Sequence, residues 1–264
     1  MSRGTMIVGD LLDRWPDGRW LSDLWDLTVS TRPPAWHPTH FGILPTAETP
    51  RDLAARRGTV FDRHVPPPAA FLRWLVNHPQ RMDVADGTTF LARSDEDREW
   101  RRKLFSPDAR LCTKAQREAL SHLTALGAEG SRLAWWAFEG FSHIDCCVVT
   151  DRFVLCVDDR RADVTAASTP WFRSRSRLWH LVEAVQQFAR GRAFGVILGV
   201  ETETQGLHAL DRCRANVTAS YPHLAPEARA ELADRLLGFV AWPTVADRFG
   251  VSPQGRPHAE RPTS

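Results

Sequence analysis

The spacing of hydrophobic and polar residues predicts helices over much of the first half of the chain. The first 60 residues are interrupted by Pro and Trp and have weak periodicity, so they predict short helical pieces and loops that pack on a core. Beyond them, apolar residues recur every three or four positions before Pro79, and Ser94 with three acidic residues after it is typical of a capped helix start. We therefore expect helices at about 69–78, 94–104 and 113–126.

The spacing of hydrophobic residues changes from a helical to a strand-like pattern in the middle of the chain. Three short runs rich in Val, Ile, Phe, Trp and Cys predict consecutive antiparallel strands, buried on both faces, at 132–139, 143–150 and 152–159. We expect three further elements, namely a helix at 175–190, a strand at 193–201 and a last helix at about 226–237. The predicted fold is mixed α/β (α+β), with a core of a helix, three antiparallel strands, a helix and a strand, and additional helices on both sides of it.

The length of 264 residues fits a single elaborated domain. We expect residues 1–112 to form a mostly helical elaboration packed on the core, and residues 113–251 to form the core with its C-terminal helix. Residues 252–264 are polar and rich in Pro, which predicts a disordered tail.

Composition predicts a cytoplasmic protein. No run of 18 apolar residues is present, and the N-terminus reaches acidic residues before any long apolar stretch, so neither a membrane span nor a signal peptide is expected. The cysteines number five and form no CxxC motif, which favours reduced thiols and disfavours a zinc site.

Charge adds little to this picture. The net charge of +2 does not by itself indicate a nucleic-acid partner. Lys103 and Lys114 are the only lysines among 34 basic residues. A compositional bias of the genome explains the excess of arginine as well as phosphate recognition does.

Three acidic residues interrupt the predicted apolar strands, and they are the first candidates for chemistry. Glu139, Asp145 and Asp158 each lie within or at the end of such a strand. Burying a carboxylate is costly unless it is paired, protonated or bound to a metal. These positions therefore indicate either a metal site or a set of ion pairs.

A hairpin between the second and third predicted strands brings two of these carboxylates together. With a two-residue turn at Asp151 and Arg152, Asp145 lies directly opposite Asp158, with Cβ atoms about 4.5–5.5 Å apart. Arg160 shares the face of Asp158, and Asp159 points to the other face. Oxygen ligands without His or Cys suit Mg²⁺ or Mn²⁺. The alternative is an ordinary ion-pair cluster in which Asp158 pairs with Arg160 or Arg161.

The same hairpin places Cys147 opposite Cys156. Two packed, reduced thiols and a redox or metal role are both compatible with this pairing.

The order of these elements and acidic residues resembles the PD-(D/E)XK nuclease-like superfamily, the restriction-endonuclease-like proteins. The similarity lies in WWAFEGFSHIDCCVVTDRFVLCVDDRRADVTAASTPW and RSRSRLWHLVEAVQQFARGRAFGVILGVE, against a bacterial pattern E-G…D…(I/V)E-x-K-R…T-x-W…R-x-Q…E-x-A. It covers residues 113–201, about a third of the chain.

The resemblance implies catalytic roles for four residues. Glu139 would be an acidic partner, Asp145 the metal-binding aspartate, Asp158 the acidic residue of the motif, and Arg160 would stand in the place of the lysine. Asp145 and Asp158 would hold Mg²⁺ or Mn²⁺. Arginine departs from the pattern, because a guanidinium stays protonated and cannot act as a general base.

A basic segment follows the motif. Arg173, Arg175 and Arg177, with tryptophans on both sides, fit phosphate contacts near a helix N-terminus. The segment Arg175-Ser176-Arg177 replaces the Arg-x-Gln of the pattern, so the glutamine is missing. A solvated helix start whose aromatic residues belong to the core is the alternative.

The resemblance implies a magnesium-dependent hydrolase acting on DNA phosphodiesters, with weak or lost activity because two motif positions depart together. The first alternative is a non-catalytic module that binds nucleic acid or protein and retains the nuclease fold. A structural protein whose carboxylates are merely ion-paired is the second, since fold does not fix function.

Overall fold

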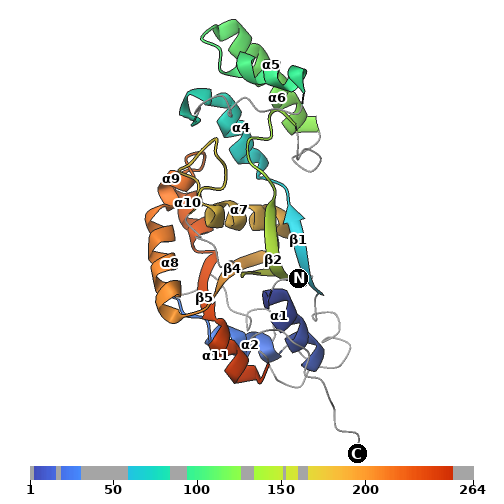
Figure 1. Cartoon of the computed structure of the whole chain (residues 1–264), viewed down its shortest axis with the longest axis vertical. Helices are drawn as coiled ribbons and strands as arrows, with labels where there is room; N and C mark the ends of the chain where they lie inside the picture. The colour runs from blue at the N-terminus through green and yellow to red at the C-terminus, as the bar shows by residue number, and fades with distance from the viewer. Residues whose placement is uncertain are drawn as a thin grey trace, which may run out of the picture.

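The computed structural model describes residues 3–15, 19–30, 59–83, 94–125, 134–150, 153–159 and 166–251. These residues form a sheet with a layer of helices on each face and a separate group of helices beyond one end (Figure 1). No helix within these ranges is long and apolar enough to cross a membrane.

The sheet has five strands whose spatial order is their order in the chain. They are β1 (Thr59–Val65), β2 (Ser142–Val149), β3 (Phe153–Asp158), β4 (Ala193–Val200) and β5 (Leu236–Ala241). The pairs β1–β2 and β2–β3 are antiparallel, whereas the pairs β3–β4 and β4–β5 are parallel. The mixed sheet confirms the predicted mixed α/β class.

One face of the sheet is covered by three helices from the two ends of the chain, α1 (Arg3–Arg14), α2 (Arg19–Asp26) and α11 (Trp242–Phe249). Alternate residues of β3, namely Phe153, Leu155 and Val157, pack into this layer beside Trp20 and Trp242. The strict alternation of the strand explains why both of its faces are apolar: each face meets a different helical layer.

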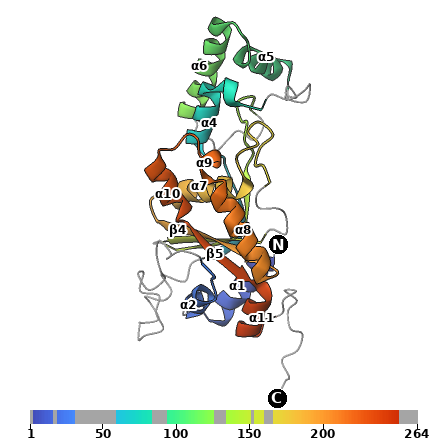
Figure 2. The same cartoon turned by 90° about the vertical axis from the view of Figure 1, so that its left-hand side faces the viewer.

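The other face is covered mainly by α7 (Arg177–Ala189) and α8 (Glu203–Ala215), with α9 (Val217–Ser220) and α10 (Pro226–Ala233) beside them (Figure 2). Ser176 caps α7 by accepting a hydrogen bond from the Trp179 amide. Arg190 ends the helix in the left-handed conformation, before Gly191. Val154 and Cys156 of β3 pack into this layer with Trp179.

A third hydrophobic cluster lies beyond the end of the sheet at which β2 begins. It is built by α4 (Ala69–Asn77), the short 3-10 helix η2 (Pro79–Arg81), α5 (Asp95–Leu104) and α6 (Ala109–Ala125). Ser94 accepts a hydrogen bond from the Asp97 amide and so caps α5 as predicted. The segment before β2 enters this cluster through Trp135, Trp136 and Phe138.

The strand predicted at 132–139 is wrong. Its described part, 134–139, consists of turns and irregular chain, because its aromatic residues pack into the helical cluster instead of pairing with a strand. The third antiparallel strand is β1, which pairs with β2 although its sequence, TVFDRHV, carries polar residues at an edge of the sheet.

The last predicted helix is wrong in its second half. The α10 helix ends at Ala233, and the following apolar run LLGFVA forms β5, which is buried throughout. The α8 helix was not predicted. Strand β1 is part of the sheet, and α1 packs against it. The sheet and its covering helices therefore include residues on both sides of position 113, the predicted start of the core. The predicted tail at 252–264 lies outside the described residues.

Candidate functional site

The β2–β3 hairpin has the predicted register. Cys147 pairs with Cys156, and Val148 pairs with Leu155. Asp145 and Asp158 follow one position beyond the last pair, at the end where β2 begins and β3 ends. Asp158 is 4% exposed, so a carboxylate lies inside this end of the sheet.

An irregularity in β2 interrupts the alternation of its side chains next to Asp145. The pairing with β1 shifts between Phe61 and Arg63, whose partners are Cys147 and Ile144. The strand thus holds one extra residue here, as in a β-bulge, and Ile144 and Cys147 pack in the same layer. The face to which Asp145 points does not follow from alternation alone.

The predicted metal group is described only in part. The side chain of Asp145 and the whole of Arg160 lie outside the described residues, so their roles remain predictions. Where side chains are described, no group of three or more His, Cys, Asp and Glu residues could hold a metal ion.

Asp159 points to the opposite face, as predicted. Its carboxylate accepts hydrogen bonds from the Gly4 amide at 3.0 Å and from the Trp242 indole at 2.6 Å. It therefore connects the end of β3 to α1 and α11.

The paired cysteines are packed thiols. The Sγ atoms of Cys147 and Cys156 are 3.2 Å apart, and both residues are fully buried. Burial raises the pKa of Cys156 well above its usual value, and the contact with Cys147 raises it further. The Cys156 thiol therefore stays protonated near neutral pH and is a poor nucleophile and metal ligand.

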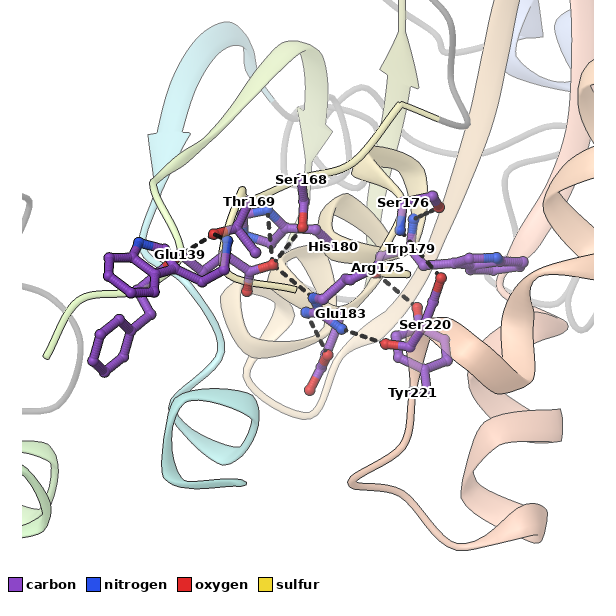
Figure 3. A network of polar contacts seen from close by, with 12 residues as sticks. Glu139, Ser168, Thr169, Arg175, Ser176, Trp179, His180, Glu183, Ser220 and Tyr221 are labelled. Atoms are coloured by element: carbon purple, nitrogen blue, oxygen red, sulfur yellow. Dashed lines mark hydrogen bonds and ion pairs between the residues drawn. The ribbon is translucent and has the colours of Figure 1, made fainter. Parts of the chain in front are cut away.

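A buried ion cluster lies beside this end of the sheet, centred on Arg175 (Figure 3). The Nε atom of Arg175 donates to Glu139 Oε1 at 2.6 Å, and one terminal nitrogen of its guanidinium donates to Glu183 Oε2 at 2.8 Å. The other terminal nitrogen donates to the carbonyl of Ser220 at 3.1 Å. The guanidinium carbon lies 3.9 Å from the centre of the Phe71 ring, so the cation is enclosed on every side that the hydrogen bonds leave open.

Both carboxylates of the cluster have further partners. Glu139 Oε1 also accepts from Ser168 Oγ at 2.8 Å and lies 3.5 Å from His180 Nδ1. Glu183 Oε1 lies 2.8 Å from His223 Nε2. Glu139 Oε2 is buried and has no hydrogen-bond partner within the described parts of the chain.

The ion pairs determine the charge states. Burial alone would lower the pKa of Arg175, but the charges of Glu139 and Glu183 outweigh it and raise that pKa. For Glu183, burial opposes ionisation, yet Arg175 and His223 lower its pKa below the usual range. Both groups are therefore ionised at neutral pH.

The three predicted phosphate-binding arginines have different environments. Arg175 exposes no side-chain surface, so its guanidinium offers no free donor to a phosphate in this structure. Arg173 and Arg177 are exposed on either side of it, at the start of α7. These two remain compatible with the predicted contact.

Sequence reasoning missed the partners of Arg175. Neither Glu183 nor His180 was among the site residues predicted from the sequence. One signal was present: Ser176, His180 and Glu183 recur at helical spacing on one side of α7, which places polar residues on an otherwise apolar helix. Nothing in the sequence brings Ser220 or His223 to this position.

Comparisons with protein-family models, with curated proteins and with solved structures gave no match to this chain.

Proposed function

We propose that this protein acts on DNA phosphodiesters through a divalent cation held by Asp145 and Asp158, with weak hydrolytic activity. The observation that supports the proposal most is the register of β2 and β3, whose last pair, Cys146 with Val157, immediately precedes these two aspartates at one end of the hairpin. Two adjacent carboxylates repel each other, and a bound cation would relieve that repulsion.

The arrangement of elements supports a nuclease-like core. Over the residues of the resemblance, helix α6, strands β2 and β3, helix α7 and strand β4 follow one another in the implied order. The third antiparallel strand is β1, which precedes that region, and the helices α4 to α6 lie between β1 and β2 in the chain.

The residues fit a cation incompletely. Asp145 and Asp158 supply the hard oxygen ligands that Mg²⁺ prefers. Glu139 binds Arg175 and Ser168 through Oε1, and its Oε2 has no hydrogen-bond partner among the residues that the structure describes. When bound, the cation would activate water and neutralise charge on the phosphodiester. Arg160 would stabilise the anionic phosphate, but it could not take a proton from the attacking water, because a guanidinium stays protonated.

A non-catalytic DNA-binding module is the second candidate. The ion cluster favours this candidate, because Glu139 and Arg175 form an ion pair with each other and do not face a ligand. In this version Arg173 and Arg177, both exposed, would contact phosphates.

Metal binding tests the first candidate. Mg²⁺ or Mn²⁺ should raise the melting temperature of the wild-type protein, because a ligand that binds the native state stabilises it by mass action. The substitution Asp158→Asn should abolish this rise. Asp159→Asn is the matched control, because it removes the adjacent carboxylate from the opposite face of the sheet and should preserve the rise. A wild-type protein indifferent to both cations would contradict the proposed site.

DNA cleavage distinguishes the two candidates. If a lysine is needed to position or deprotonate water, Arg160→Lys should increase Mg²⁺-dependent cleavage by more than tenfold. If the arginine acts through its charge alone, the change should stay within about tenfold, or ~1.4 kcal/mol of barrier. Absence of cleavage by both proteins, together with salt-sensitive binding that requires Arg173 and Arg177, would favour the binding module.

A further inference from the structure

The solvent face of α6 carries three cations in a row. Arg110, Lys114 and Arg117 are exposed and occupy positions i, i+4 and i+7 of the helix. Because residues at this spacing share one side of a helix, the three charges form a stripe about 10 Å long. We call these three residues the α6 stripe.

The stripe lies opposite the side by which α6 is anchored. Ala115, Ala119 and Leu123 are buried in the helical cluster, and their positions point about half a turn away from the stripe. The stripe is therefore not required for packing, and its three charges face solvent.

The acidic residues on and just before α6 have partners of their own. Glu118 pairs with His122 at 3.3 Å, and Asp108 accepts a hydrogen bond from the Arg110 amide at 2.8 Å. No ion pair of the three stripe side chains occurs within the part of the chain that the structure describes. Three like charges at this spacing repel one another, so the helix gains no stability from their arrangement.

The two lysines of this arginine-rich chain meet at the same aromatic ring. Lys103 Nζ and Lys114 Nζ lie 4.6 Å and 5.8 Å from the centre of the Trp100 ring, which stacks on Trp135 at 5.7 Å. Lys103 also pairs with Glu99 at 3.7 Å. The stacked indoles thus lie beside the middle residue of the stripe, Lys114, and attract its ammonium group.

The helical cluster that carries the stripe begins at the end of the sheet where Glu139 and Asp158 lie. Phe138, immediately before Glu139, is part of its core, and Arg101 of α5 lies over the Phe138 ring. A long ligand that leaves this end of the sheet would run along the helices α4 to α6 (Figure 1).

We infer that the α6 stripe binds the phosphate backbone of duplex DNA, as a contact separate from the candidate cation site. The inference deepens the proposed function, on which the identity of the ligand rests. The charge complementarity supports it: three exposed cations in a row, without an ion pair to any described residue, match a row of phosphates, and Lys114 also lies near the Trp100 ring. The partner is recognised by charge and spacing, so no preference for base sequence is expected.

A salt titration of DNA binding tests the stripe. Fluorescence anisotropy with a labelled duplex would be measured for the full-length protein and for the triple variant Arg110→Gln, Lys114→Gln, Arg117→Gln. Each phosphate contact contributes about 0.9 to the slope of log K against log salt, so the variant should show a slope shallower by about 2.7. Its affinity at low salt should fall by more than about tenfold.

A matched control removes the same charge elsewhere. The triple variant Arg212→Gln, Arg214→Gln, Arg248→Gln changes residues on α8 and α11. It should alter the slope of log K against log salt by less than about 0.9, the contribution of one phosphate contact. Equal effects of the two triple variants would overturn the inference, because they would indicate a response to net charge alone. A wild-type protein that binds an acidic peptide but not the duplex would also overturn it, in favour of a protein partner.

The test is separable from that of the cation site. The stripe variant should keep the full rise of melting temperature in Mg²⁺, since the three substituted residues are not part of the proposed cation site at Asp145 and Asp158. An absent Mg²⁺ effect together with stripe-dependent binding would refute the hydrolytic proposal and uphold the stripe. An intact Mg²⁺ effect without a change in salt slope would refute the stripe alone.

Discussion

The buried ion cluster around Arg175 and the α6 stripe use the same residue type in opposite ways. Arg175 is fully enclosed and has two carboxylates and a carbonyl as partners. Arg110 and Arg117 are exposed, with Lys114 between them on the same side of the helix. The first arrangement holds segments of the protein together, whereas the second leaves positive charge available to a partner. Burial and partners, not the identity of the residue, separate the two roles.

The largest expected effect comes from removing the central cation of the buried cluster. Arg175→Met should lower the free energy of unfolding by about 3–5 kcal/mol, because Glu139 and Glu183 would remain buried without their counter-charge. Denaturant unfolding measures the change. Arg173→Met, at an exposed position two residues away, is the control and should change stability by less than about 0.5 kcal/mol. A similarly small loss for Arg175→Met would contradict a structural role for the cluster.

A smaller, pH-dependent effect is expected at Glu183. Its pKa is lowered in the folded protein, so its ionised form contributes stability above its unfolded pKa, near 4.5, and this contribution disappears as pH falls through the folded pKa. Glu183→Gln should therefore cost about 2 kcal/mol at pH 7, and the difference from wild type should shrink progressively below pH 4.5. Unfolding curves measured from pH 3 to pH 7 test this. A difference that stays constant across the range would show that the charge of Glu183 does not matter.

The smallest effect is expected at the stripe. The triple glutamine variant at Arg110, Lys114 and Arg117 should retain its unfolding free energy within about 0.5 kcal/mol, because substitutions of exposed surface residues contribute little to stability. Paired with its predicted loss of DNA affinity, this result would separate binding from folding. A loss above about 1 kcal/mol would mean that the stripe supports the helical cluster.

Local features of the fold could be predicted from the sequence, and distant ones could not. The pairing of Cys147 with Cys156 follows from a short connection and two apolar runs, which are close together in the chain. The pairing of β1 with β2 joins residues about 80 positions apart, and β1 has too many polar residues to resemble a buried strand. The aromatic run at 134–138 matches a strand in composition, but the helical cluster offered its side chains a larger apolar surface.

The candidate site follows the same rule. The predicted proximity of Asp145 to Asp158 depends on one hairpin, whose register between Cys146 and Val149 was accessible from the sequence. The partners of Arg175 come from the segment before β2, from α7 and from α9, so only the assembled fold brings them together. The bulge beside Asp145 depends on the pairing with β1, which the sequence did not predict.

The insertion of α4, α5 and α6 between β1 and β2 has a consequence for how the chain folds. Closing a loop costs conformational entropy that grows with the logarithm of its length, by about 0.6 kcal/mol for each doubling. The β2–β3 hairpin closes a very short loop, whereas β1 reaches β2 across the whole segment from Pro66 to Phe141. If the helices gather around Phe71 and Phe138 early, they shorten that loop before the strands meet. Folding should then proceed from the hairpin and the helical cluster, with β1 joining the sheet late, and the rate of that last step should depend on how stable the cluster is on its own.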